Sequence, residues 1–231
     1  MRHNGRQGQA HPIMYIPSSF RVDDPARLAK FVQRHSFATL VTFHAGAPFA
    51  SHLPMLFRPA VGPHGTLVSH MARANPQWED FVSGDEALAI FHGPHSYISP
   101  SWYATGPAVP TWNYAAVHAY GVPTVFAEHD RVVALFRETV ATYESSFERP
   151  WPGDLPDEYR DKLIHGIVAF EIPITRIEGK FKLGQNRSAA DVQGAIEGLS
   201  RTDDSDSRAV ARMMAAESAV DQPALGPVPR R

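Results

Sequence analysis

The chain has 231 residues, of which 43% are hydrophobic and 20% are charged, so it has enough apolar residues to build a core without staples. It contains no cysteine, which excludes disulfides, thiolate nucleophiles, cysteine-ligated zinc and iron–sulfur clusters. The formal net charge of −2 argues against a dominant surface for nucleic acid.

Both ends of the chain are expected to lie outside the folded core. Residues 1–13 are polar without periodicity, which predicts a flexible arm, and they lack the apolar region of a signal peptide. No run approaches the roughly 18 apolar residues of a membrane span, so we expect a cytoplasmic protein with no membrane partner. Residues 202–231 predict a weak Ala/Met helix at 207–218 and then a flexible Pro-rich tail. The folded domain is therefore expected at 14–201.

The first half of this domain is expected to contain short strands and two helices. Asp24 and Pro25 supply an N-cap and a proline at the first helical position, so a helix should begin there. Glycine and proline bound the β-type runs that follow, at residues 38–43, 49–57, 66–70 and 87–91. A short helix is predicted at 76–82, and Gly93-Pro94 predicts a turn after the last of these strands.

The second half continues the same pattern. A strand is predicted at 109–122, a helix with regular apolar spacing at 131–147, and a long strand at 166–183. Short strands at close spacing with few helices between them favour a barrel or sandwich over a parallel βαβ sheet. The fold class is therefore predicted as mainly β (α+β) with flanking helices.

Common catalytic signatures are missing. The sequence has no G-x-G-x-x-G, P-loop, G-x-S-x-G or H-E-x-x-H motif, so Rossmann dehydrogenases, NTPases, α/β-hydrolases and zincins are disfavoured. Among twelve histidines, His92 and His95 form an H-x-x-H pair, but no carboxylate lies near them in sequence. We predict no metal site; these histidines would bond to backbone or line a polar pocket.

One segment, residues 69–78, has the pattern of a phosphate site. A strand ends near Ser69 and His70, and a helix opens with Asn75 as its N-cap. A helix N-terminus offers free N–H groups and a positive dipole end, and Arg73 just before it could hold phosphate with two donors. His70 could add another donor. The alternative is that Asn75 only caps the helix and that the Arg73 side chain is solvated.

A second segment is aromatic. Residues 91–103 and 109–114 combine phenylalanine, tyrosine and tryptophan with hydroxyl and amide groups, which suits a flat ligand with a polar edge. The alternative is an ordinary aromatic core with a wet rim.

A third segment, residues 178–187, is basic. Alternation places Lys180 and Lys182 on one face of a strand, and Gln185, Asn186 and Arg187 lead into a predicted helix. This cluster could bind an anion or the polar edge of a base. The alternative is a solvated strand end.

Together these segments closely resemble the PaiB-type family, which comprises FMN-binding split-barrel proteins often labelled negative transcriptional regulators. The matching segments run in order from Met14 to Arg187 and read MYIPSSF, SHLPMLF, SHMARANPQW, HGPHSYISPSWY, VPTWNY, VHAYG and KFKLGQNR. Two departures occur: Gly184 stands where the family more usually has serine, and the tail after Thr202 matches no segment of the family.

The resemblance implies a six-stranded split β-barrel that binds FMN at a homodimer interface. It implies that Arg73 and the start of the Asn75 helix contact the phosphate, and that strand segments around the Ser-His pairs contact the ring and ribityl chain. The complete set of implied FMN contacts is Ser51, His52, Ser69, His70, Arg73, Asn75, Lys180, Lys182, Gln185, Asn186 and Arg187, the last five as weaker candidates from the partner subunit.

Several functions remain open at this stage. The family label favours a regulator or sensor that uses FMN. A flavin-dependent oxidoreductase using NAD(P)H is the alternative, because bound FMN carries the redox chemistry itself and needs no catalytic side chain. A weaker alternative is heme binding, because some split-barrel relatives bind heme and histidine is abundant.

The expected partners are a second copy of the chain, FMN and a small-molecule or redox partner. No tight, direct DNA binding is expected, because the chain shows no helix-turn-helix and no basic recognition helix.

Overall fold

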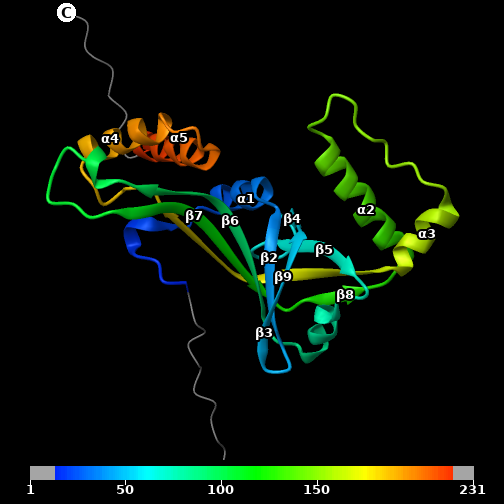
Figure 1. Cartoon of the computed structure of the whole chain (residues 1–231). Helices are drawn as coiled ribbons and strands as arrows, with labels where there is room; N and C mark the ends of the chain where they lie inside the picture. The colour runs from blue at the N-terminus through cyan, green and yellow to red at the C-terminus, as the bar shows by residue number, and fades with distance from the viewer. Residues whose placement is uncertain (1–13, 221–231) are drawn as a thin grey trace, which may run out of the picture.

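The computed structural model describes residues 14–220 and contains one nine-stranded sheet in the order β3-β2-β6-β7-β9-β5-β4, with β1 and β8 also paired to β9 (Figure 1). Every strand pair is antiparallel. The long strands are β2 (Phe37–His44), β3 (Ala47–Pro54), β5 (Thr66–Ala72), β6 (Ala87–Ile98), β7 (Thr111–Gly121) and β9 (Ile167–Lys182). The short ones are β1 (Arg21–Val22), β4 (Leu56–Arg58) and β8 (Thr124–Phe126). The predicted α+β class, with six long strands, is confirmed.

Strand β9 joins the two parts of the sheet. Its first residues, 167–173, pair with β5, and its later residues, 174–182, pair with β7. The sheet therefore curls around one core, whose largest fully buried side chains include Leu40, Phe91 and Phe170. A side chain at Gly121 would collide with the backbone of Pro173, so the β7–β9 crossing needs glycine there.

Two helices begin where the sequence predicts. α1 (Pro25–Arg34) is capped by Asp24, whose carboxylate accepts a 3.0 Å hydrogen bond from the Ala26 N–H. The 3₁₀ helix η2 (Pro76–Ser83) is capped by Asn75, whose Oδ1 accepts from the Gln77 N–H at 3.0 Å. The remaining helices are η1 (Ser18–Phe20), η3 (Pro100–Trp102), α2 (His129–Glu144), α3 (Asp157–His165), α4 (Ala189–Ser200) and α5 (Ser205–Val220).

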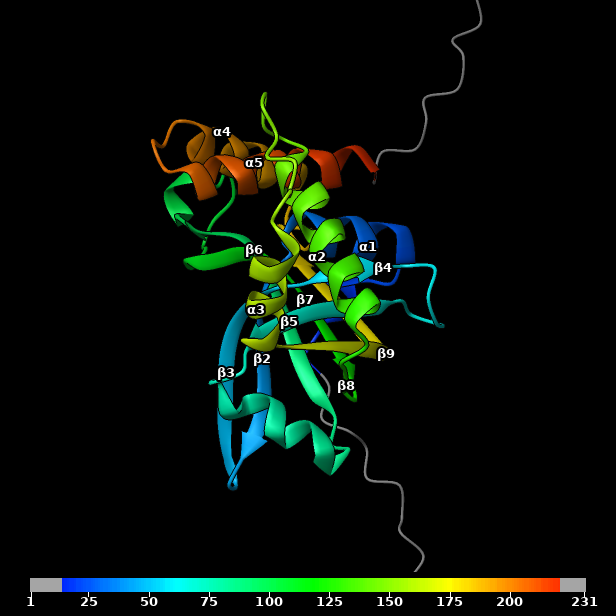
Figure 2. The same cartoon turned by 90° about the vertical axis from the view of Figure 1, so that its right-hand side faces the viewer.

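Four of the helices lie in two pairs at opposite ends of the sheet. Helices α2 and α3 stand at one end and α4 and α5 at the other, as the two views show (Figures 1 and 2). β9 runs between these ends, with its first residue two positions after α3 and its last residue before α4. Between residues 14 and 220, no helix is long and apolar enough to cross a membrane.

The packed unit extends beyond the predicted boundary at residue 201. In α5, Val210, Ala211 and Met214 are at most 3% exposed and belong to the main core. Their small and flexible side chains let the helix pack closely on β6 and β7. The predicted domain end is therefore too early, and the helix is not a weak appendage. The predicted arm at residues 1–13 and the last part of the predicted tail, 221–231, lie outside the described residues.

Gly93 and Pro94 do not form the predicted turn. They lie inside β6, at a bulge between His92 and His95 in the register with β7. A Cβ at Gly93 would come within 2.7 Å of the Phe31 ring, so glycine lets α1 lie close to the strand.

Candidate functional site

The predicted site residues Ser51, Ser69 and Asn75 come from β3, β5 and the start of η2. Asn75 Nδ2 donates to Ser51 Oγ at 2.8 Å. Ser69 is 2% exposed, and its Oγ donates to the carbonyl oxygen of Pro54 at 2.6 Å. The structure thus brings Ser51 and Asn75 together, whereas the Ser69 hydroxyl is used inside the fold.

Arg73 is exposed and held in place by backbone. Its Nε donates to the His165 carbonyl at 2.9 Å, and its Nη2 donates to the Ile167 carbonyl at 2.7 Å. These bonds leave other N–H groups of the five-donor guanidinium fork, which can reach an anion without moving the arginine. The Arg73 guanidinium is thus fixed at the junction between α3 and β9 while it remains exposed.

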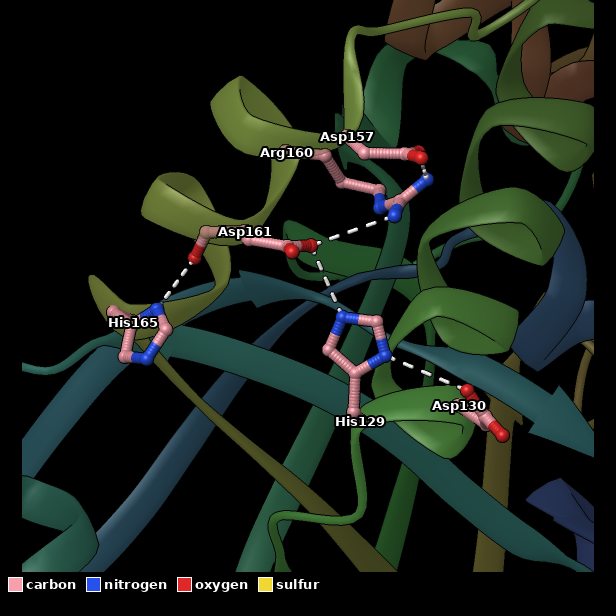
Figure 3. A network of polar contacts seen from close by, with 6 residues as sticks. All are labelled: His129, Asp130, Asp157, Arg160, Asp161 and His165. Atoms are coloured by element: carbon pink, nitrogen blue, oxygen red, sulfur yellow. Dashed lines mark hydrogen bonds and ion pairs between the residues drawn. The ribbon is translucent and has the colours of Figure 1, made fainter.

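A polar network fastens α3, whose last residue Arg73 contacts, to the start of α2 (Figure 3). His129 Nε2 lies 3.0 Å from Asp161 Oδ1, and Arg160 forms ion pairs with Asp157 at 2.7 Å and Asp161 at 3.4 Å. Hydrogen bonds to Asp161 and then to Asp130 raise the pKa of His129 above its usual value. The network sets the position of the α3 end that Arg73 contacts.

His52 and His70 have different neighbours and different exposure. His52 is exposed on β3, with Nδ1 3.0 Å from Thr39 Oγ1 and its ring stacked at 6.5 Å on Phe37. His70 packs on Phe136 of α2, with ring centroids 5.2 Å apart, and burial lowers its pKa.

The basic residues Lys180 and Lys182 lie at the far end of β9. The Lys180 ammonium donates to the Tyr15 carbonyl at 2.9 Å and sits 5.3 Å from the ring centres of both Tyr15 and Tyr114. Lys182 Nζ donates to the Trp112 carbonyl at 2.9 Å. Burial is the largest cause of the lowered Lys182 pKa, and the charges of Lys180 and Arg187 lower it further.

The side chains of the residues that follow β9 differ in their contacts and exposure. The Gln185 side chain caps the strand end, donating to the Phe181 carbonyl at 2.7 Å and accepting from the Leu183 N–H at 2.8 Å. Asn186 is exposed. The Arg187 guanidinium lies 4.5 Å over the Tyr103 ring. The predicted helix after them is α4.

The two groups of predicted residues are far apart in one subunit. Ile167, next to the Arg73 group, and Lys180 are separated by thirteen steps of β9, a path along the curved strand of roughly 40 Å at about 3.3 Å per residue. One FMN molecule is shorter than this. Within one subunit the two groups therefore lie at opposite ends of β9.

A broad side of the sheet, here called the open face, carries aromatic and histidine side chains. By register, Tyr97, Trp112, His118 and Tyr120 share this side with Phe37 of β2. Phe37 is 67% exposed, Trp112 53% and Tyr97 45%. The opposite side of β7, with Ala115 and Val117, is fully buried. The open face thus combines exposed rings with polar groups, as the aromatic segment predicts for a flat ligand.

His118 and Tyr120 were missed as candidate residues. Tyr120 Oη lies 3.5 Å from both His118 Nδ1 and Glu178 Oε2, and Arg176 stacks 3.8 Å over its ring. Burial lowers the His118 pKa and raises the Tyr120 pKa, in each case as the largest cause. The alternation in V-H-A-Y-G, read as a strand, would have placed both side chains on one face.

The described residues include no group of three or more His, Asp or Glu side chains able to hold a metal ion. The histidines instead bond to neighbouring side chains and line pockets.

Two solved structures show a likeness to this fold. The flavocytochrome Anf3 from Azotobacter vinelandii has a TM-score of 0.56 at 11% identity, over 70% of this chain and 69% of that one. The FAD and heme binding protein from Mycobacterium smegmatis has a TM-score of 0.51 at 16% identity, over 76% of this chain and 79% of that one. These likenesses confirm the split-barrel fold.

Sequence comparison then defines the family. Residues 14–176 match the family described as "Putative FMN-binding domain", and the chain belongs to it. The chain is also 37% identical over 202 residues to the protease synthase and sporulation protein PAI 2 of Bacillus subtilis strain 168, covering 87% of this chain and 96% of that protein. The predicted resemblance to the PaiB-type family is confirmed.

Proposed function

We propose that this protein binds FMN at the interface of a homodimer and acts as a flavin-dependent regulator or sensor of the PaiB type in the cytoplasm. The observation that carries the proposal is the position of the two candidate groups at opposite ends of β9. Family membership supports flavin as the ligand.

A two-fold axis accounts for this separation. In a symmetric dimer the same patch is used on both subunits, so each end of one patch meets the opposite end of its copy. Pairing through the open face would bring the Lys180 end of one subunit towards the Arg73 end of its partner. The exposed rings of Phe37, Tyr97 and Trp112 would be buried by this pairing.

The residues present fit a bound FMN. Arg73 offers a fixed guanidinium for the phosphate, the open face offers rings for the flat flavin, and His118 and Tyr120 offer polar groups for its edge. Bound FMN would supply hydride and one-electron chemistry. The chain's own residues would orient the flavin, exclude water from it and hold protons at the His118 imidazole and the Tyr120 hydroxyl.

An absorbance spectrum combined with light scattering tests the proposal. The purified protein should scatter as a dimer and show, or acquire on addition of FMN, a bound-flavin spectrum. The proposal would be contradicted if the protein scattered as a monomer and its addition left the fluorescence of FMN unchanged. A heme spectrum would instead support the heme-binding alternative, for which the FAD and heme binding protein from Mycobacterium smegmatis gives a precedent on the same fold.

The enzymatic alternative has its own measurement. A flavin-dependent oxidoreductase would oxidise NAD(P)H in air at a rate proportional to bound FMN. A flavin that remains oxidised with excess NAD(P)H would favour the sensor.

Regulation is proposed to act without tight, direct DNA binding. Specific DNA binding depends heavily on neutralising phosphates, and a chain with net charge −2 and scattered basic residues is poorly suited to it. Fluorescence anisotropy at physiological salt should show only weak, salt-sensitive binding to promoter and random duplexes. Nanomolar binding with preference for one sequence would refute this part of the proposal.

A further inference from the structure

A pocket of about 700 Å³ lies between α1, the β6 bulge and α5, where the two views place α5 above α1 (Figures 1 and 2). Its lining includes none of the residues expected to contact FMN. Pockets of this size typically bind small molecules. Strand β6 pairs with β2 at residues 88–90 only. Residues 92–95 of β6, which follow this paired stretch, line the pocket.

The interior of this pocket is apolar. Phe31 and Pro94 are buried and contribute to its lining, as do Phe181, Met213 and Ala209. An aromatic or aliphatic body would replace water against these side chains, which favours binding. The core packing of α1 and α5 keeps the walls in place, because Val32 and Val210 are fully buried.

The rim of the pocket is positively charged. Lys30 and Arg34 project from α1 and Arg212 from α5, and none of the three takes part in an ion pair between the described residues. Lys30 and Arg34 are four residues apart on one helix, a spacing at which like charges destabilise each other. Arg27, the fourth cation of the lining, pairs with Glu217. A bound anion would relieve this repulsion.

Three histidines complete the lining, with one carboxylate. His35, His92 and His95 surround the entrance, and His95 Nδ1 lies 3.6 Å from Asp206. Burial is the largest cause of the lowered pKa values of His35 and His92; the Arg34 charge also lowers the first and the His95 charge the second. Neutral imidazoles each keep one N–H to donate to an anion.

From this arrangement we propose that the pocket binds a small organic anion with an apolar body of one or two rings and a terminal phosphate or carboxylate group. The rings would lie against Phe31 and Phe181, and the anionic group would lie between Arg34 and Arg212. The pocket lining contains none of the eleven residues implied to contact FMN, and His95 lies with its ring centre 6.1 Å from Trp112 of the open face, so the pocket adjoins the proposed flavin site.

Four probes test the proposal on the full-length protein, with and without saturating FMN. The probes are 1-naphthyl phosphate, 1-naphthoate, 1-naphthol and inorganic phosphate, titrated calorimetrically. At least one of the two naphthyl anions should bind about tenfold or more tightly than naphthol and than inorganic phosphate. Only the naphthyl anions combine a charged group with an apolar body. The tighter of the two anions identifies the terminal group.

Substitutions locate the binding. Arg34→Gln and Arg212→Gln should each weaken the naphthyl anion about tenfold, the usual effect of losing a charge-assisted hydrogen bond. Arg201→Gln, at an exposed arginine outside the pocket, is the matched control and should change nothing. In the unaltered protein, the same anion should shift the NMR signals of the His35, His92 and His95 imidazoles.

Three results would overturn the proposal. The first is that neither naphthyl anion binds more tightly than naphthol. The second is that both pocket variants bind the anion as tightly as the unaltered protein does. The third is that FMN displaces the anion competitively, which would assign the anion to the flavin site. Because the probes are also titrated without FMN, loss of the flavin proposal would leave this measurement decisive.

Discussion

Arg73 Nε donates a 2.9 Å hydrogen bond to the carbonyl oxygen of His165, ninety-two positions later in the chain. The residue with the clearest phosphate-binding pattern thus also ties the segment after β5 to the junction between α3 and β9. Its backbone partners fix the guanidinium without neutralising its charge, because carbonyl oxygens carry no formal charge.

Replacing Arg73 should separate these two roles. Arg73→Ala is expected to weaken FMN about tenfold or more, since charge-assisted bonds to phosphate contribute roughly 1.5–3 kcal/mol. Riboflavin, which lacks the phosphate, should lose little. Fluorescence titration of both flavins gives the comparison, and Arg73→Lys, which keeps the charge but not the fork, should lie between. Equal losses for the two flavins would show that the variant acts through the fold instead.

The His129–Asp161 pair should make the attachment of α3 depend on pH. Folding raises the His129 pKa above 6.5, so its contribution is complete below pH 6.5 and is lost as pH rises through the folded value. Folding lowers the Asp161 pKa, so that contribution is present above about pH 4 and is lost as pH falls through its own folded value. Attachment should be strongest between these limits.

Hydrogen exchange of α3 amides at several pH values measures this effect. In the unaltered protein, protection corrected for intrinsic exchange should decrease from pH 6 to pH 9. His129→Gln should abolish the pH dependence, while His64→Gln, at an exposed loop histidine, should retain it. A decrease of the same size in both variants would assign the effect to other groups.

Local signals allowed much of the fold to be predicted from sequence, and packing explains the exceptions. Asp24 and Asn75 cap their helices as predicted, because capping depends on only a few neighbouring residues. Gly93-Pro94 has the local signature of a turn, yet pairing with β7 and the approach of Phe31 keep it within a strand. Burial of α5 could not be predicted, because Ala and Met suit both exposed and buried helices.

In the candidate site, too, local features could be predicted from the sequence, whereas contacts between distant segments could not. Alternation correctly gave Lys180 and Lys182 a common face, and the Asn75 cap was visible in its own segment. The bonds of Arg73 to His165 and of Ser69 to Pro54 join segments that are distant in sequence, and no local pattern indicates them.

Met214 should be essential to the stability of the C-terminal helix pair. It is 1% exposed, belongs to the main core and accepts a hydrogen bond from Asn113 Nδ2 at 3.3 Å. Met214→Ala is expected to lower the free energy of unfolding by about 2–5 kcal/mol, the usual cost for a large-to-small change in a core. Met213→Ala, at the half-buried neighbour, should cost less. Denaturant unfolding measures both, and equal values would contradict the packing of α5 described above.

Trp112 tests the open face as the dimer interface. Its ring is 53% exposed and meets Tyr97 edge-on at 6.1 Å, so it lies among the side chains that a second copy would cover. Trp112→Glu would bury a charged carboxylate in an apolar contact, which is unfavourable. The dimer should therefore dissociate, because dissociation returns the carboxylate to water. Light scattering should then show a monomer, and FMN affinity should fall with it, because each subunit would lose the residues that its partner supplies. Tyr159→Glu is the matched control: Tyr159 is 55% exposed on α3, and its replacement should leave both the dimer and the affinity intact. A dimer that survives Trp112→Glu with full FMN affinity would move the interface elsewhere, and the two ends of β9 would then need another explanation.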